Sequence, residues 1–242
     1  MLLKLENPKL FSEVVSIISE LVLEVRIRVN HNGLTITAID PANVSMILFS
    51  LPSSSFTQFV IEQEEVLGVS LESLKAVLRR IKAGSVLTIT REENELKLLI
   101  VDKVRREFNL ALIDIESEEK PIPNLEFTSK IEMNSVDFSE AIEDAGVVAD
   151  AASFIAAPDK FVIAARGSLN SFRSEFTDEV NIVAEESKSK YSLEYLQKMT
   201  KGTKLSDKTI INFSNDYPLR LDFKTSLLSL SFILAPRVEN EE

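Results

Sequence analysis

The side chains of this chain best suited to chemistry are lysines and arginines gathered in two clusters, at 75–82 and 188–204. Together the clusters hold nine of the 27 basic residues. Ammonium and guanidinium groups bind phosphate oxygens without reading bases, so this chemistry is sequence-independent binding of a nucleic-acid backbone. The candidate DNA-binding residues are Lys75, Arg79, Arg80, Lys82, Lys188, Lys190, Lys198, Lys201 and Lys204.

Residues suited to catalysis or metal binding are scarce. The chain has no cysteine, which excludes disulfides, thiolate metal sites and cysteine nucleophiles. Its only histidine, His31, precedes Asn32-Gly33, a pair typical of a hairpin turn. The six glycines lie too far apart to form a phosphate-binding loop. We therefore expect a protein that is not an enzyme and that has no cofactor and no metal.

The net charge of −11 restricts how such a chain can bind DNA. An acidic protein does not attract nucleic acid over its whole surface, so the basic residues must be segregated on one face. Residues 70–82 meet this requirement, because their cations lie opposite a leucine stripe at helical spacing. Two other predicted helices do not meet it. Their acidic residues, which would repel DNA, are Glu13, Glu20, Asp137, Glu140, Glu143 and Asp144.

The chain contains an internal repeat. Asn7 and the run Phe11-Ser12-Glu13 recur as Asn134 and Phe138-Ser139-Glu140, at an offset of 127 residues. Two further matches follow in the same order, 70–74 with 192–196 and 86–100 with 209–223. Ordered matches at a nearly constant offset predict a duplicated domain. The Pro-containing stretch at 117–126 indicates a connector, with one domain at 1–116 and the other at 127–242.

Each half contains two predicted helices and many predicted strands. Apolar spacings of three and four predict helices over 10–22, capped by Asn7, and over 70–82, capped by Ser70. The second half repeats both helices. Period-two alternation predicts a hairpin over 25–39 and strands at 44–51, 65–71, 85–90, 95–101, 106–115, 161–166, 171–176, 180–185, 209–214, 219–223 and 228–234. These elements favour an α+β fold of antiparallel sheets with helices on one face.

This organisation resembles that of the proliferating cell nuclear antigen (PCNA) family of DNA sliding clamps. The motifs that carry the resemblance are LTITAIDPANVSMI from Leu34, LIDIESEEKPIPNLEF from Leu112, NDYPLRLDF from Asn215 and the C-terminal FILAPRVENEE. The most specific of them is Leu-Ala-Pro followed by a basic residue. The match covers essentially the whole chain, and its short length without cysteine suggests an archaeal member.

The resemblance implies a DNA-clamp fold of two duplicated domains, each with two helices on the inner face of a ring. Three subunits would close the ring by pairing an edge strand at 106–115 with an edge strand at 168–176 of the next subunit. Such head-to-tail pairing removes exposed strand edges. The candidate interface residues are Phe108, Leu110, Leu112, Phe172 and Phe176.

The resemblance also implies a pocket that receives short peptide motifs of partner proteins. The positions that match it are Ile39, Val44, Ile122, Pro123, Pro218, Leu234, Ala235 and Pro236. The partners expected are double-stranded DNA, a DNA polymerase, a clamp loader, a flap nuclease and a ligase.

The acidic helices leave three assemblies open. The chain forms a homotrimeric clamp, or one subunit of a heterotrimeric or specialised clamp with weak DNA contact, or an acidic protein-interaction scaffold. No apolar run approaches the ~20 residues of a membrane span, and the N-terminus lacks the apolar core of a signal peptide. We expect a cytoplasmic location in the archaeal cytosol or nucleoid, or a nuclear one in a eukaryote.

Overall fold

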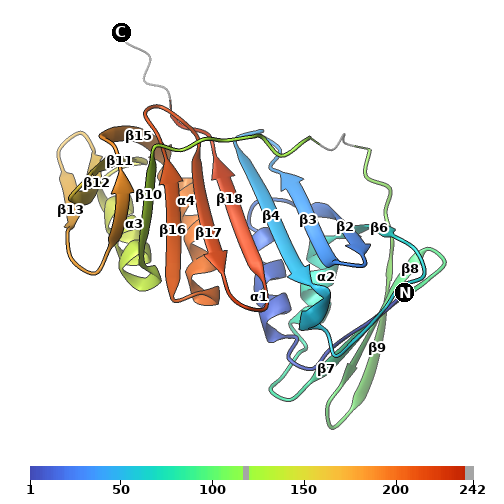
Figure 1. The fold of residues 1–242 in the computed structure, drawn as a ribbon. Coiled ribbons are helices and arrows are strands. Elements are labelled where there is room, and N and C mark those ends of the chain that lie inside the picture. The colour runs from blue at the N-terminus through green and yellow to red at the C-terminus, as the bar shows by residue number, and fades with distance from the viewer. Residues whose placement is uncertain (117–119, 238–242) are drawn as a thin grey trace. The chain divides into compact units, whose positions relative to one another are not determined.

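The computed structural model describes residues 1–116 and 120–237, which form two compact units (Figure 1). Unit 1 comprises Met1–Pro41, Ile47–Lys120 and Thr225–Leu230. Unit 2 comprises Ala42–Met46, Pro121–Lys224 and Ser231–Glu242. Three residues of the predicted connector, 117–119, and the last five residues of the chain lie outside the described part.

Unit 1 holds two helices and two antiparallel layers of strands. The helices are α1 (Lys9–Ile18) and α2 (Leu71–Leu78). The strands run in the orders β5-β1-β7-β8-β9 and β4-β3-β2-β6. Their bounds are β1 (Leu2–Leu5), β2 (Glu24–Asn30), β3 (Gly33–Ile39), β4 (Ser45–Pro52), β5 (Gln58–Val60), β6 (Glu65–Ser70), β7 (Val86–Glu92), β8 (Glu95–Val101) and β9 (Arg105–Ala111).

Unit 2 repeats this arrangement. Its helices are α3 (Ser135–Val148) and α4 (Leu193–Met199), and a 3-10 turn, η2 (Thr200–Leu205), extends α4. The strands run in the orders β14-β10-β16-β17-β18 and β13-β12-β11-β15. Because each order matches its counterpart in unit 1 position by position, the duplication predicted from the sequence is confirmed. The bounds are β10 (Ser129–Asn134), β11 (Ala151–Ala157), β12 (Lys160–Arg166), β13 (Ser171–Phe176), β14 (Asn181–Ala184), β15 (Ser187–Ser192), β16 (Lys208–Phe213), β17 (Leu219–Lys224) and β18 (Ser229–Leu234).

Local sequence explains where the elements start and stop. The turn at Asn32-Gly33 forms as predicted, with Asn30 opposite Gly33 in the β2–β3 hairpin. Ser70 caps α2 by accepting a hydrogen bond from the Ser73 N–H at 3.4 Å. The predicted cap of α1 is wrong: Pro8 rather than Asn7 stands at the N-cap, and its ring restricts the backbone there. Helices α1 and α2 also end at Ile18 and Leu78, before the predicted 22 and 82.

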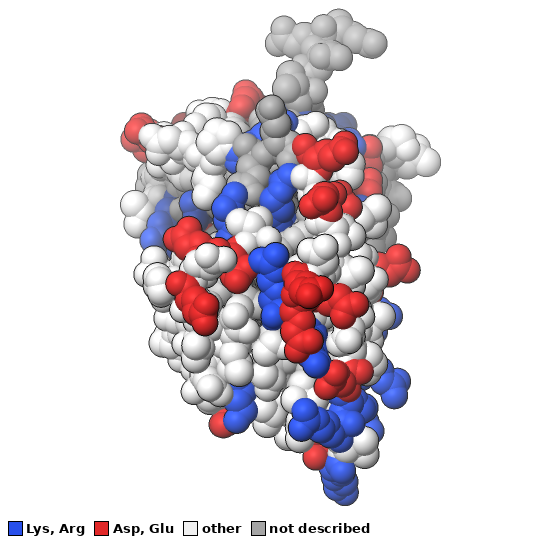
Figure 2. Space-filling view, turned by 90° about the vertical axis from the view of Figure 1, so that its right-hand side faces the viewer, with Lys and Arg blue, Asp and Glu red and all other residues white. Residues whose placement is uncertain are grey.

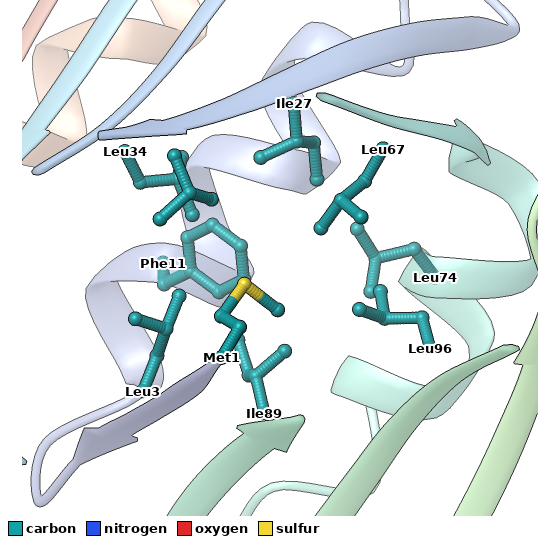
Figure 3. Close-up of a pocket in the computed structure, with 10 residues that line it drawn as sticks. Met1, Leu3, Phe11, Ile27, Leu34, Leu67, Leu74, Ile89 and Leu96 are labelled. Carbon is teal, nitrogen blue, oxygen red and sulfur yellow. The ribbon is translucent and has the colours of Figure 1, made fainter. Parts of the chain in front are cut away.

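Each unit has its own core. In unit 1, apolar side chains from strands and both helices surround a small cavity of about 10 Å³ (Figure 3). In unit 2, Phe154 is the centre of an aromatic cluster and packs edge-on against Phe138, Phe161, Tyr191 and Phe213 at centroid distances of 5.3–6.2 Å. Since Phe138 belongs to α3, this cluster fixes the helix on the core face of the sheet.

Two of the strand edges are covered by the segment that follows the last strand of the same unit. After β9, the Ile113 N–H donates to the Gly68 carbonyl of β6 at 2.9 Å. In unit 2, the Arg237 N–H donates in the same manner to the Lys190 carbonyl of β15 at 2.7 Å. These bonds satisfy backbone groups that would otherwise be open to another chain.

Within the described residues, no helix is both long and apolar enough to span a membrane. The same part of the chain contains no group of three or more acidic, histidine or cysteine side chains placed to hold a metal ion.

Candidate nucleic-acid and partner interface

Three exposed cations lie at the end of α2. Arg79 is the C-cap of the helix, Arg80 and Lys82 follow it, and all three are exposed. Arg106 supports this turn, because its guanidinium donates to the Arg80 carbonyl at 3.1 Å and pairs with Asp102. Basic groups at a helix C-terminus are also favoured by the helix dipole. The turn therefore offers positive charge to solvent on a fixed backbone.

Lys75 differs from the other predicted cations of this cluster. Its Nζ donates to Ser19 Oγ at 2.8 Å and lies 3.8 Å from Glu20 Oε1. Only 19% of its side chain is exposed. Lys75 therefore connects α2 to the end of α1, and most of its charge is balanced inside unit 1.

The corresponding cations of unit 2 lie around α4 and η2. Lys201 and Lys204 are exposed on η2. Lys198 lies on α4, where it pairs with Glu194 at 2.8 Å and sits 5.5 Å from the centre of the Tyr195 ring. The exposed cations thus stand at the ends of α2 and α4, which are equivalent positions of the two units.

Lys188 and Lys190 do not join this cluster, so their predicted grouping with α4 is corrected. Both lie on β15, where they are opposite Ile155 and Ser153 of β11. The alternate residues Ser189 and Tyr191 face the core with Phe154. Because side chains alternate along a strand, the two lysines project from the sheet face opposite to the helices.

The acidic side of α3 is exposed to solvent. Its carboxylates occupy the exposed positions between the buried Phe138, Ala141, Ile142 and Ala145. No other described residue pairs with them in an ion pair. They are Asp137, Glu140, Glu143 and Asp144. On α1, Glu13 is compensated by Lys9 at 3.9 Å.

Most residues predicted for the peptide pocket are at least partly accessible. Ile39 ends β3 in unit 1 and is half-buried, as are Val44 and Pro218 in unit 2. Ile122 is 55% exposed. The Ala235 N–H donates to the Val44 carbonyl at 2.9 Å and so brings these two positions together. Pro123 is exposed and Pro236 is half-buried.

Leu234 does not belong to this accessible set, which corrects the prediction, because the residue is 0% exposed. It faces the core of its unit, so a peptide can reach only its neighbours. An aromatic pair that was not predicted stands beside Pro218. Phe127 packs edge-on against Tyr217, the residue before Pro218, with ring centroids 6.0 Å apart. The hydroxyl of Tyr191 donates to the Tyr217 carbonyl at 2.7 Å and fixes that turn.

A polar groove of about 330 Å³ lies on the β10, β16 and β17 face of unit 2. Asp222, which is 3% exposed, accepts from Ser231 Oγ at 2.5 Å, Arg220 Nε at 3.0 Å and Asn212 Nδ2 at 3.3 Å. Lys224 lies 3.8 Å from the same carboxylate. The groove also contains Phe127 and Lys130. The hydrogen bonds and ion pairs of the buried Asp222 carboxylate are thus made with neighbouring side chains of the same unit.

The two predicted edge strands are both sheet ends, namely β9 and β13. Phe108 and Leu110 of β9 and Phe172 and Phe176 of β13 are half-buried. Phe176 stacks on Phe161 of its own unit at 6.0 Å. Leu112 lies beyond the end of β9, and its N–H bonds to the Asn94 carbonyl at 2.8 Å. The edge strands are therefore shorter than the predicted 106–115 and 168–176.

Three carboxylates have a pKa below their ordinary values. The Val104 backbone N–H, and then the Arg106 charge, lower the pKa of Asp102. A hydrogen bond from Arg237 lowers the pKa of Asp150. The ammonium of Lys198 lowers the pKa of Glu194. Each of these carboxylates is paired with a cation of its own unit.

Residues 1–120 match the family model "Proliferating cell nuclear antigen, N-terminal domain", and residues 121–238 match the corresponding C-terminal domain. The DNA polymerase sliding clamp of Thermococcus fumicolans is 35% identical, and that of Pyrococcus furiosus is 34% identical, with 97% of each chain covered in both comparisons.

Solved structures show the same fold. The proliferating cellular nuclear antigen of Entamoeba histolytica superimposes with a TM-score of 0.93 at 20% identity, and 98% of each chain is covered. A chain of the PCNA2-PCNA3 complex of Sulfolobus tokodaii superimposes with a TM-score of 0.90 at 28% identity, covering 99% of this chain and all of that one.

Proposed function

Because this chain belongs to the proliferating cell nuclear antigen family, we propose that it is a subunit of a sliding clamp that encircles duplex DNA. In this role it is a non-catalytic processivity factor and docking platform for a DNA polymerase. The relatives named DNA polymerase sliding clamp cover nearly the whole chain, which supports this assignment.

The observation that carries the proposal is the repeated placement of exposed cations. Arg79, Arg80 and Lys82 follow α2, while Lys201 and Lys204 follow α4. Facing the phosphates of a central duplex, these side chains attract DNA at any sequence and leave the bases unread. Such contacts permit sliding, because every register along the backbone is electrostatically equivalent.

The experiment measures clamp retention on circular DNA and its salt dependence. In the variant Arg79→Ala, Arg80→Ala, Lys82→Ala, the log–log salt slope should fall by ~0.9 for each phosphate that the protein no longer neutralises. A charge-matched control replaces Lys130, Lys188 and Lys224, which are exposed on strands β10, β15 and β17. Equal slopes for both variants would remove the α2 end from the DNA surface.

The same proposal includes a peptide-docking surface formed around Ile122, Pro218 and Ala235. Apolar side chains at this rim provide anchoring for a short motif of a polymerase, clamp loader, flap nuclease or ligase. The double variant Ile122→Ala, Ala235→Asp should abolish binding of a partner peptide while the assembly mass is unchanged. Retained peptide affinity would exclude these two residues from the surface.

A mixed ring is the second candidate, and the bare acidic side of α3 favours it. Four unpaired carboxylates facing a duplex weaken its attraction, and more basic sister subunits would compensate for that loss. Mass measurement of the chain alone and mixed with clamp paralogues distinguishes the two. A stable trimer of the chain alone supports the homotrimer, whereas assembly only after mixing supports the mixed ring.

A further inference from the structure

The outer face of β10, β16 and β17 in unit 2 carries the polar groove of about 330 Å³. Ile131, Ile211 and Leu221 of these strands are buried in the core, on the side where α3 and η2 pack. The groove residues of the strands occupy the alternate positions, so their side chains project from the opposite face of the sheet. The groove is therefore separate from the exposed cations that follow α4.

This outer face has an excess of positive charge. On the three strands, the charged residues that alternate with the core are the cations Lys130, Lys208, Arg220 and Lys224 and the carboxylates Glu132 and Asp222. The chain as a whole has a net charge of −11, so a surplus of cations on one sheet face is a local exception. Such a surface attracts an anionic partner.

Two of these cations have hydrogen-bond donors to offer. Lys130 is exposed, and none of the described carboxylates forms an ion pair with it. Arg220 donates to Asp222 through Nε at 3.0 Å, which leaves the N–H groups of its two terminal nitrogens for another acceptor. Asp222 is 3% exposed, so its carboxylate lies below the surface that a ligand would meet.

The charges on the side of unit 1 that carries β8 and β9 are arranged differently. Figure 2 shows basic and acidic side chains interspersed over that side. Lys97, for example, lies 3.2 Å from Glu92 and 3.1 Å from Glu107, so its charge is balanced by neighbours. An acceptor from another molecule could supply the corresponding balance for Lys130 in unit 2.

Apolar side chains connect the groove with the proposed peptide-docking surface. Leu125 and Phe127 line the groove, and they continue the segment that carries Ile122. Phe127 also packs edge-on against Tyr217, which precedes Pro218. Since Ile122 and Pro218 belong to the docking surface, a peptide bound there has the groove as its next contact.

We propose that the groove binds an acidic stretch of a partner protein, adjacent in sequence to the apolar motif that occupies the peptide-docking surface. This inference rests on the proposed docking function and adds a rule of selection: partners with glutamate or aspartate beside the motif are preferred. Lys130 and the terminal nitrogens of Arg220 bind the carboxylates, and Leu125 and Phe127 contact the aliphatic carbons of the same peptide.

Duplex DNA suits the groove less well than a peptide does. Phosphates follow one another closely along each strand of DNA, so a duplex needs an uninterrupted row of cations. Here Glu132 and Asp222 interrupt the row, and Leu125 and Phe127 form an apolar wall. A peptide can place its carboxylates at the cations and its carbon chains at the wall.

Paired peptides test the selection. A fluorescein-labelled docking peptide of a clamp-binding polymerase is extended at one end by four glutamates or by four glutamines, and a second pair is extended at the other end. At one of the two ends, the glutamate peptide should bind about tenfold more tightly at low salt, and this advantage should fall below about twofold at high salt. Equal affinities within both pairs would overturn the proposal.

Lys130→Glu tests the groove itself, since no ion pair with a described residue is lost by the substitution. The advantage of the glutamate peptide should fall below about twofold, while the affinity for the glutamine peptide stays the same. The matched control, Lys103→Glu, makes the same change of charge at an exposed residue between β8 and β9 and should keep the advantage. Equal losses in both variants would mean that only net charge acts, and would overturn the proposal.

A short linear duplex tests the other occupant. Lys130→Glu and Lys103→Glu should bind it with equal affinity, and a selective loss in Lys130→Glu would assign the groove to DNA instead. The docking surface has its own measurement. The glutamine peptide should bind the original protein at least about tenfold more tightly than it binds the variant Ile122→Ala, Ala235→Asp. Absence of that difference would remove the docking surface, whichever peptide of a pair bound better.

Discussion

The backbone N–H of Ile113 donates to the Gly68 carbonyl at 2.9 Å, and this bond fastens the segment after β9 to the edge of β6. Gly68 allows the approach, because a Cβ there would meet the Ile113 carbonyl oxygen. Arg26 holds the same segment through the Ile115 carbonyl. The segment at 112–116, which leads to the connector, is thus fastened to unit 1.

Gly68→Ala should therefore release this segment. The new Cβ would clash with the Ile113 carbonyl, and the backbone there cannot move aside as a flexible side chain could. We therefore expect a loss of about 1–3 kcal/mol in the free energy of unfolding. Hydrogen exchange at the Ile113 amide should also accelerate. The control is Gly146→Ala, whose Cβ meets only the movable end of Gln197. Unchanged exchange at Ile113 would contradict the anchoring role.

Replacement of Lys75 should affect stability more than DNA binding. Lys75→Ala removes the bond to Ser19 and the ion pair with Glu20 and should cost about 1 kcal/mol in the free energy of unfolding. Its salt slope for DNA retention should remain close to that of the original protein. A slope change as large as that of Arg79→Ala would instead place the Lys75 charge at the DNA.

Neutralising the acidic side of α3 should strengthen DNA association. With Asp137→Asn, Glu140→Gln, Glu143→Gln and Asp144→Asn, we expect about fivefold tighter retention at low salt, because four repulsive charges are removed. The control neutralises the equally exposed Glu62, Glu64, Glu93 and Glu95. If both variants gain equally, only net charge matters and α3 does not face the duplex.

Asp102 should make stability dependent on pH in the acid range. Its pKa is lowered in the folded chain by the Val104 N–H and by Arg106. The stabilisation is therefore complete above the unfolded value of about 4 and is lost as pH falls through the lowered folded pKa. Asp102→Asn should flatten the thermal-stability profile below about pH 4. Identical acid profiles for both proteins would contradict this.

The sequence predicted the elements with strong periodicity. The helix starts near Ser70, the hairpin at Asn32-Gly33 and the strands β7, β8 and β17 follow directly from local patterns. Five strands escaped prediction: β1, β5, β10, β11 and β15. β5 has three residues, and β15 reads SKSKYS, in which serines fill three of the four buried positions. Local apolar periodicity cannot reveal strands of these kinds.

By itself, the sequence determined the duplication, the fold class and the segregation of basic residues, because each is written as a pattern along the chain. Only the tertiary structure decided which of the predicted site residues are accessible to DNA or to a partner. Lys75 is held by Ser19, Leu234 is fully buried, and Lys188 and Lys190 project from the sheet face opposite to the helices. These outcomes depend on pairing register and on contacts between distant segments, and neither is encoded in the spacing of neighbouring residues.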